Sequence, residues 1–328
     1  FSRPTSAVYS DSSGLSSHDR LATIDMTQSP PQDASQVKRI DPILRQIVEA
    51  VSESGARAHL ERIVGPRDPF EGQAGMEAAA DSIAEALRGF GLHLAEDRFR
   101  CDGRWYRNLI ASHPGTFRDG QVLVVAHYDT VRNSPGADDN ASGVAGLLEV
   151  AGALASHRFK HDLIFVAFAL EEYGNPGSRH YVEQAKASGV TIAGVFDLEM
   201  IGYTGPTQTA PIGVQTPMEG DFIGVVGNRR SERLVSLFKD TAALVVPSLP
   251  VQALVVEGNG DDRPVVRQSD HAPFWDAGYP AVMITDTAFL RNPHYHLPTD
   301  TLDTLDLSFL QQVAAATAAS AAVLAGLA

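Results

Sequence analysis

The chain has very little cysteine: among its 328 residues only Cys101 carries a thiol. An intrachain disulfide and a cysteine-based zinc site are therefore excluded, and cysteine usage says nothing about the compartment. Two catalytic motifs are absent as well. Without a Gly-x-Ser-x-Gly turn a serine hydrolase is disfavoured, and without His-Glu-x-x-His the metalloproteases built on that motif are excluded.

Basic residues are scarce relative to acidic ones. The sequence has 26 Lys and Arg against 40 Asp and Glu, which gives a formal net charge of −14. This balance argues against nucleic acid or an anionic membrane as a partner, because both require a basic patch. No apolar run approaches ~18 residues, so we expect no transmembrane helix. The simplest interpretation of the charge is solubility; the alternative is that bound cations neutralise some carboxylates.

The first 38 residues lack a sustained hydrophobic period and are rich in Ser, Pro, Thr and Asp. We expect an extended N-terminal arm over 1–38 and one domain over 39–328. The chain starts at Phe1 rather than Met, which indicates either a removed leader or a numbering that begins inside a longer product. The working expectation is a secreted or periplasmic protein, with a cytoplasmic one as the alternative. The oligomeric state cannot be read from the pattern.

Beyond the arm, apolar runs alternate with helical stripes, and this alternation predicts an α/β fold. The expected strands cover 107–112, 121–127, 162–169 and 192–200, and the expected helices begin at Asp41 and cover 75–90, 144–154 and 307–327. The runs 121–127 and 162–169 are almost purely apolar, which is typical of central strands covered on both faces. With the helix 144–154 between them, for which Asp139 or Asn140 is the expected N-cap, they predict a right-handed βαβ unit.

Potential metal ligands follow these strands at the points where the strands end. Ligands of α/β proteins bind at the carboxyl ends of the strands. Five clusters stand there or near the C-terminus: His127 and Asp129, Asp138 and Asp139, Glu171 and Glu172, Asp197 and Glu199, and His294 and His296. Each cluster alone is commonly a capping turn, a solvated loop or a surface histidine. Together they offer the imidazole and carboxylate groups that suit two borderline divalent cations such as Zn²⁺.

The strings that hold these clusters are HYDTV, GADDNASG, ALEEYGNPGSRHY, LEMIGY, SDHAPFWDAGYPAV and PHYHLPTDT. In this order, and over roughly residues 40–328, they resemble the M28 family of zinc aminopeptidases. The resemblance implies a single α/β domain with a mixed, mostly parallel central sheet that is flanked by helices on both faces. It also implies a co-catalytic pair of zinc ions, two per chain.

The resemblance further implies a set of metal ligands. One zinc ion would take His127, the other would take Glu172 and His296, and both would share Asp139, the second Asp of GADDN. The fifth ligand of the family is usually the Asp of an LDM string. This sequence reads LEM, so the matching residue is Glu199. Asp197, two residues away on the same face of the strand, is the alternative.

Three other residues have implied roles. Asp129 would accept the second N–H of the strand-terminal histidine and fix its tautomer; the alternative is an Asx-turn after the strand. Glu171 would take a proton from a water held between the zinc ions and pass it to the leaving amine. Tyr295 would donate a hydrogen bond to the oxyanion or would only pack. The string SDHAPF is expected to support the ligands from behind, without coordination by His271.

On this basis we expect a metal-dependent exopeptidase, and most specifically an aminopeptidase whose partner is a peptide or small aminoacyl substrate with a free amino terminus. The loops 203–222 and 256–269 are expected to form its S1 pocket. Aromatic candidates for an apolar lining, or for ordinary core, are Phe222, Phe274, Trp275 and Phe289. Two alternatives on the same fold stay open: a glutaminyl-cyclase-like acyltransferase with one zinc ion, and a non-catalytic binding homologue, which would lack ligands. Carboxypeptidase or dipeptide activity also stays open.

Overall fold

The computed structural model describes residues 40–117, 120–210 and 214–327. The residues from Ile40 onward form one compact unit. The arm expected over 1–38 lies outside the described residues, so that expectation stays a prediction.

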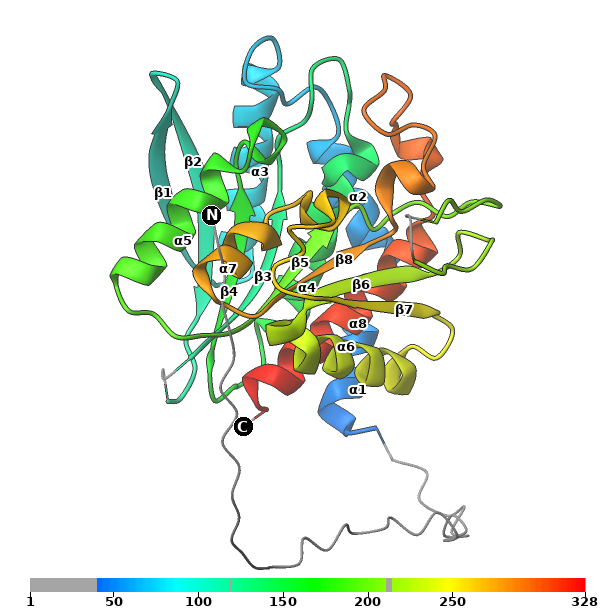
Figure 1. Cartoon of the computed structure of the whole chain (residues 1–328). Coiled ribbons are helices and arrows are strands. Elements are labelled where there is room, and N and C mark those ends of the chain that lie inside the picture. Colours follow the sequence, from blue (N-terminus) through cyan, green and yellow to red (C-terminus); the bar gives the residue numbers. More distant parts are fainter. Residues whose placement is uncertain (1–39, 118–119, 211–213, 328) are drawn as a thin grey trace, which may run out of the picture. The chain divides into compact units, whose positions relative to one another are not determined.

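One eight-stranded sheet runs through the described part of this unit (Figure 1). Its strands are β1 (His93–Cys101), β2 (Arg104–His113), β3 (Gln121–His127), β4 (Asp162–Phe168), β5 (Ile192–Glu199), β6 (Ile223–Asn228), β7 (Val251–Val256) and β8 (Ala281–Thr285). They lie in the order β1-β2-β4-β3-β5-β8-β6-β7. The pairs β3–β4, β3–β5, β5–β8 and β6–β7 are parallel, and the remaining three pairs are antiparallel. The expected mixed, mostly parallel sheet is thus confirmed.

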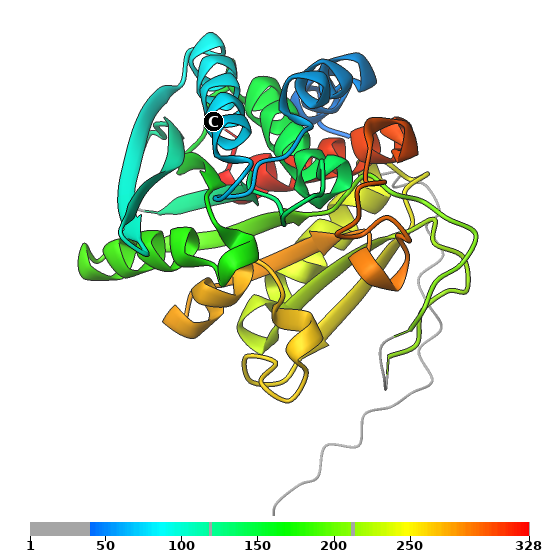
Figure 2. The same cartoon turned by 90° about the horizontal axis from the view of Figure 1, so that it is seen from above.

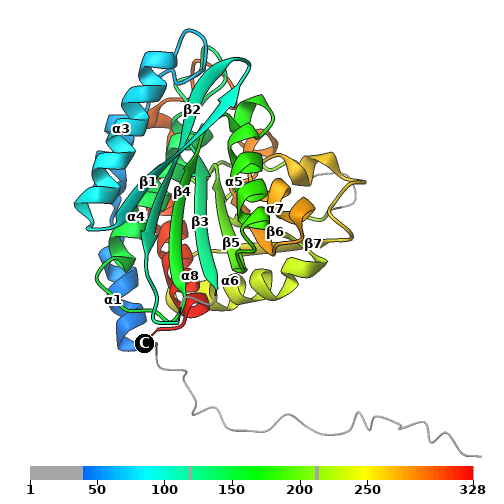
Figure 3. The same ribbon diagram turned by 90° about the vertical axis from the view of Figure 1, so that its left-hand side faces the viewer.

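Helices cover both faces of the sheet, as Figure 3 shows. In the described residues the α-helices are α1 (Pro42–Ala50), α2 (Glu53–Ile63), α3 (Gln73–Gly89), α4 (Gly143–Leu154), α5 (Pro176–Ala187), α6 (Glu232–Val245), α7 (His271–Ala277) and α8 (Leu307–Ala325). Residues of α1 to α4, α6 and α8 form the larger hydrophobic core on one face. Residues of α5 and α7 form the smaller core on the other face.

Strand β3 shows why the apolar runs become central strands. Val122 and Val124 belong to the larger core, whereas Leu123 and Val125 belong to the smaller one. Successive side chains of a strand point to opposite faces, so a strand that is apolar at every position buries all of its side chains only between two covered faces. The apolar runs at 121–127 and 162–169 were predicted to be central on this argument, and they are.

The expected N-cap of the helix between β3 and β4 is wrong. α4 begins at Gly143 and its N-cap is Ser142, rather than Asp139 or Asn140. A π-helical turn over Ala137–Ser142 precedes α4, and within it Asp139 and Asn140 have non-helical dihedral angles. The Asn140 side chain nevertheless accepts a hydrogen bond from the backbone N–H of Gly143 (3.0 Å). This turn is held by distant parts of the chain, described below, rather than by the helix that follows it.

The C-terminal helix α8 is apolar on nearly all sides. By length and composition alone it could cross a membrane, but 67% of its most apolar window is buried in this unit. It packs against α1, α4 and α6. The expectation drawn from apolar run length overlooked this segment because polar residues, Gln311 and Gln312 among them, interrupt it. Within it, the hydroxyls of Thr317 and Ser320 donate to backbone carbonyls one turn earlier. A helix that is apolar all round and covered by other helices is a core helix.

Arg67 is fully buried and ties the loop after α2 to the segment that follows β3. Its guanidinium donates hydrogen bonds of 2.7 to 3.0 Å to the backbone carbonyls of Ile63, Gly65, Tyr128, Pro135 and Gly136. Burial lowers the pKa of Arg67 to about 10, so the guanidinium remains charged at neutral pH. Removal of this side chain would take a charged donor from the buried carbonyls of Ile63 and Tyr128, which is costly, whereas Pro135 and Gly136 would keep their backbone donors.

We therefore expect Arg67→Met to lower the free energy of unfolding by about 3 kcal/mol or more, because hydrogen bonds from a charged donor contribute ~1.5–3 kcal/mol each. The matched control is Arg62→Met. Arg62 pairs with Glu85 at the surface, and an exposed pair contributes at most ~1 kcal/mol. Urea denaturation of the three proteins at equal metal content measures the difference. Equal losses in the two variants would contradict the role assigned to Arg67.

Candidate metal centre

The candidate ligands lie together at the carboxyl ends of the central strands. β4, β3 and β5 are neighbours, and the segments that follow them gather at the top of the unit in Figure 1, which Figure 2 shows from above. His127 and Glu199 are the last residues of β3 and β5. Glu172 lies in a 3-10 turn after β4, Asp139 in the turn before α4, and His296 in the loop after β8.

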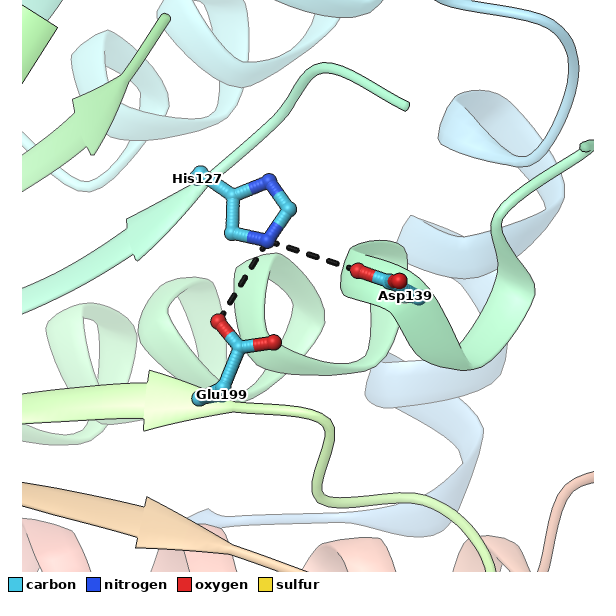
Figure 4. Close-up of side chains that lie close together, drawn as sticks. All are labelled: His127, Asp139 and Glu199. Carbon is cyan, nitrogen blue, oxygen red and sulfur yellow. Dashed lines mark ion pairs between the residues drawn. The ribbon is translucent and has the colours of Figure 1, made fainter. Parts of the chain in front are cut away.

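Asp139 joins two groups of potential ligands. Its Oδ1 lies 3.4 Å from Nε2 of His127, and Oε2 of Glu199 lies 3.3 Å from the same nitrogen (Figure 4). Its Oδ2 lies 3.1 Å from Nε2 of His296, and that nitrogen lies 3.2 Å from Oε2 of Glu172. In each group the three potential ligand atoms lie within 4.8 Å of one another. The structure therefore brings together all five residues that were expected to hold metal.

Several side-chain atoms of the candidate ligands have no hydrogen-bond partner among the described residues. They are Nε2 of His127, Nε2 of His296 and Oε1 of Glu172, and all three are buried. Buried polar atoms are normally satisfied, because an unpaired one costs about 1–3 kcal/mol. A cation in each group would give these atoms partners. Imidazole nitrogen combined with carboxylate oxygen is a donor set that zinc accepts, so the residues present fit this metal.

The charges of the centre also favour bound cations. Burial and the neighbouring Asp139 raise the pKa of Glu172 to about 8. Burial also raises the pKa values of Glu171 and Glu199. Burial lowers the pKa of His127, but the nearby carboxylates, Glu199 foremost, raise it well above its usual value. So many buried carboxylates repel one another, and divalent cations between them would offset that repulsion.

Asp129 connects the ends of β3 and β4. Its Oδ1 accepts a hydrogen bond from the backbone N–H of Glu171 (3.0 Å), and its Oδ2 accepts one from the N–H of Glu172 (3.2 Å). Its Oδ1 also faces Nδ1 of His127, at 3.6 Å, which is longer than a hydrogen bond. The contact expected between Asp129 and His127 is therefore a close approach rather than a hydrogen bond. The two backbone contacts were not predicted.

Glu171 lies beside the centre without belonging to either group. Its Oε2 is 3.9 Å from Nε2 of His127. Its Oε1 accepts a hydrogen bond from the side-chain amide of Asn175 (3.1 Å), and this amide is also 3.4 Å from Oδ1 of Asp270. Asn175 has a left-handed backbone conformation (φ 61°), which asparagine tolerates better than most residues. Sequence reasoning missed this amide because nothing in the pattern marks an asparagine as the partner of a carboxylate four residues earlier.

The turn that carries Asp139 is held from a distance. Asp300 accepts hydrogen bonds from the backbone N–H groups of Asp138 (2.9 Å) and Asp139 (3.1 Å). The Asn140 amide donates to the carbonyl of Leu198 (2.8 Å), and the Asp139–Asn140 peptide is cis. Asp300 was not predicted to act at the site, although it stands four residues after His296 in the string PHYHLPTD. Asp138 and Asn140 thus take part in the contacts that hold the turn.

Asp197 and Glu199 occupy different surroundings. Glu199 accepts a hydrogen bond from the hydroxyl of Ser269 (2.7 Å) and faces His127. Asp197 accepts one from the backbone N–H of His271 (2.9 Å), and the same oxygen lies 3.2 Å from Nδ1 of that residue. Asp197 and His271 are thus paired with each other, outside both ligand groups. This arrangement favours Glu199 over Asp197, and it places Ser269 behind a candidate ligand.

His294 and Tyr295, which stand beside His296 in the sequence, belong to neither ligand group. Nδ1 of His294 lies 3.0 Å from the hydroxyl of Thr299, so His294 stands in neither group. The ring of Tyr295 stacks on that of His296, with centroids 3.7 Å apart. Burial raises the pKa of Tyr295, which keeps its hydroxyl protonated. No described contact links this hydroxyl to the ligand groups, so its catalytic role stays a prediction.

A pocket of about 890 Å³, open space at its mouth included, borders the centre at Glu199 and Tyr295. The loop 203–222 contributes Gln208, Val214 and Phe222, and the loop 256–269 contributes Val265, Val266 and Gln268. Phe289 lines it as well, whereas Phe274 and Trp275 are packed in the smaller core. The two loops expected to form a pocket therefore do so, with two of the four aromatic candidates.

Comparison with known proteins gives a consistent picture. The sequence model of peptidase family M28 matches residues 108–321. The uncharacterized protein YfbL of Escherichia coli is 35% identical over 255 residues, which are 73% of this chain and 77% of YfbL. Aminopeptidase YwaD of Bacillus subtilis is 32% identical over 196 residues, 58% of this chain. The match spans only 38% of YwaD.

Solved structures share the fold at lower identity. The aminopeptidase from Aneurinibacillus sp. strain AM-1 superposes with a TM-score of 0.69 at 16% identity, over 87% of this chain and 97% of that one. The glutaminyl cyclase of Porphyromonas gingivalis superposes with a TM-score of 0.63 at 24% identity, over 83% and 98% of the two chains. These similarities confirm the single α/β domain with a mixed sheet.

The different surroundings of Glu199 and Asp197 lead to a prediction about metal affinity. Glu199→Gln should weaken the binding of zinc by more than ~100-fold, since residues that only support ligands already contribute ~10–100-fold. Asp197→Asn should weaken it by less than ~10-fold, because Asp197 is paired with His271 and not with a candidate ligand. Metal analysis after dialysis against buffered free zinc measures both. If only Asp197→Asn loses metal, Asp197 is the ligand and Glu199 is not.

Proposed function

Because this chain belongs to peptidase family M28, we propose that it is a zinc-dependent aminopeptidase with two zinc ions per chain. Its substrates are peptides or small aminoacyl compounds with a free amino terminus. The observation that carries the proposal is the position of Asp139, whose two carboxylate oxygens face different histidines at 3.4 and 3.1 Å. A one-ion site would not need this arrangement.

The five residues around Asp139 would hold the metal. His127 and Glu199 would complete one site, and Glu172 and His296 would complete the other. Bound zinc supplies Lewis acidity, which activates water and polarises the scissile carbonyl. The chain's own residues fix where this chemistry occurs. Ser269 orients Glu199 through a hydrogen bond of 2.7 Å.

Glu171 would be the general base. It takes a proton from the attacking water and passes it to the nitrogen of the leaving amine as the peptide bond breaks. It is free for this role because it belongs to neither ligand group. Two contacts hold it: Asp129 accepts from its backbone N–H, and the Asn175 amide donates to one of its carboxylate oxygens. The other oxygen is left for the water.

Tyr295 would donate a hydrogen bond to the oxyanion that forms on the carbonyl oxygen. What supports this is its place in the lining of the pocket, next to the proposed ligand His296 in sequence and stacked on its ring. The pocket beside Glu199 would receive the side chain of the N-terminal residue. The substrate's scissile bond would then lie between this pocket and Glu171.

The requirement for a free amino terminus can be tested directly. We expect L-leucyl-p-nitroanilide to be hydrolysed and its N-acetyl derivative to be hydrolysed at least ~100-fold more slowly, because loss of a polar group that a site is built to bind costs such factors. The comparison is of kcat/KM for the two compounds at saturating zinc. Equal turnover would assign the chain to the amidases or another class of exopeptidase.

The roles of the paired glutamates should separate on mutation. Wild type should carry two zinc ions per chain, and Glu171→Gln should retain both. Its kcat should fall by ~10²–10⁴, the usual contribution of a positioned general base, with a smaller change in KM. Glu172→Gln, the matched control, should lose metal first. Metal analysis and kinetics on both variants provide the test.

Two outcomes of that test would contradict the proposal. Near-normal turnover by Glu171→Gln would remove the general base from the mechanism. A wild-type protein that holds only one zinc ion per chain and does not gain aminopeptidase activity with more zinc would favour a glutaminyl-cyclase-like reaction. Release of a cyclised product from glutaminyl peptides would then identify that reaction.

A further inference from the structure

The segment between β5 and β6 folds back on itself beside the pocket. The backbones of Gly205 and Gly220 exchange two hydrogen bonds, of 3.0 and 2.8 Å, and the N–H of Gln208 donates to the carbonyl of Met218 (2.9 Å). Gln208 and Phe222 both line the pocket. One wall of the pocket is thus formed by a segment outside the sheet, and its position depends on the contacts that hold it.

Arg291 holds this segment. Its Nε donates to Oε1 of Gln208 (2.9 Å), its Nη1 donates to the carbonyl of Tyr203 (3.2 Å), and its guanidinium carbon lies 4.5 Å from the centre of the Phe222 ring. A Cβ atom at Gly220 would lie 2.6 Å from Nε of Arg291, so the segment approaches the arginine more closely than a side chain at that position would permit. Arg291 is 6% exposed.

The same contacts link the segment to the loop after β8. The amide of Gln208 donates to the hydroxyl of Thr287 (2.9 Å), and the backbone N–H of Thr209 donates to the carbonyl of Leu290 (2.8 Å). Gln208, Thr287 and Leu290 all line the pocket. Arg291 itself does not line it. Its guanidinium therefore stands behind the wall and fixes the side chains that form it.

A planar guanidinium suits this place better than another cation. It offers donors in a fixed fork and stacks on an aromatic ring at the same time, which an ammonium group cannot do. Burial lowers the pKa of Arg291, and the negative charges of Asp286, Asp138 and Asp221 act in the opposite direction. The interaction with Phe222 and the hydrogen bond to Gln208 each depend on the orientation of the plane.

The wall side chains also indicate what the pocket accepts. Apart from Glu199 and Tyr295 at the metal end, its described lining is apolar or carries uncharged amide and hydroxyl groups, as in Gln252, Gln268 and Thr285. A charged side chain would find no opposite charge there and would lose its hydration, which is costly. The apolar part of the lining includes the large side chains of Phe222, Leu254 and Met283, and a large apolar substrate side chain would bury more of this surface than a methyl group would.

From these contacts we infer that Arg291 is a positioning residue for substrate selection. By holding Gln208 and Phe222 in place it shapes the pocket to large uncharged side chains, such as those of leucine, methionine and phenylalanine. This inference rests on the proposed function, because it takes the pocket to be the site of the N-terminal side chain.

The test compares Arg291→Met and Arg291→Lys with wild type and with Arg62→Met, a surface control. For Arg291→Met, kcat/KM for leucyl relative to alanyl p-nitroanilide should fall by about 10-fold, the effect of a misfit of one or two methylene groups in an apolar pocket. The loss should appear as a higher KM for the leucyl substrate, with a smaller change in kcat and with zinc content retained. Arg291→Lys should rescue little, because it lacks the planar fork.

Binding of free L-leucine and L-alanine to the zinc-loaded proteins, measured by titration calorimetry, separates this inference from the proposed function. One possible result is that wild type binds leucine more tightly than alanine, that Arg291→Met loses this preference, and that wild type cleaves neither anilide. In that case the proposed function fails and the inference stands. If Arg291→Met does not fold, Gln208→Leu, which removes the partner at the wall, must lose the same preference. The inference is overturned if wild type has no preference, or if the variants weaken both ligands equally.

Discussion

The carboxylate of Asp139 lies between two histidines, and the polar edge of the sheet is organised around it. A buried carboxylate in this position requires positive charge on both sides and a backbone that fixes its direction. His127 and His296 lie on the two sides of Asp139, where bound cations would supply the positive charge. Asp300 meets the second by accepting two hydrogen bonds from the turn, and Arg67 adds to it by holding the carbonyl that precedes the turn. Contacts from three distant parts of the chain therefore converge on one side chain.

The sequence predicted most about the site where the order of the strands alone brings residues together. β3 and β4 are apolar after their first residues, so the polar residues that end or follow them had to emerge at one edge of the sheet. Neighbouring parallel strands then bring His127, Glu172 and Glu199 close together. The helical stripes at 75–90, 144–154 and 307–327 were found because burial imposes a period that is visible in the residues, whereas α2, α5, α6 and α7 were not predicted. The choice of Glu199 over Asp197 needed the family resemblance, since both point to the same face of β5.

The contacts that hold these residues in place could not be predicted. The partners of Arg67 and Asp300 are backbone groups as many as 69 and 162 residues away in sequence, and a backbone group leaves no trace in the pattern of residue types. The same limit applies to Arg291, whose position behind the pocket depends on how a segment outside the sheet folds back. The strands β1, β6, β7 and β8 were not predicted either; β6, β7 and β8 have only five or six residues each, which is too short to show a period.

One carboxylate, that of Asp129, serves the ends of two strands at once. It accepts from the backbone of Glu171 and of Glu172, and it faces His127 at 3.6 Å. A side chain shared in this way makes the energies of its partners depend on one another. The proposed base and two proposed ligands are therefore members of a single cooperative unit. Its free energy cannot be divided among them residue by residue, and a perturbation at the end of β3 is transmitted to the end of β4.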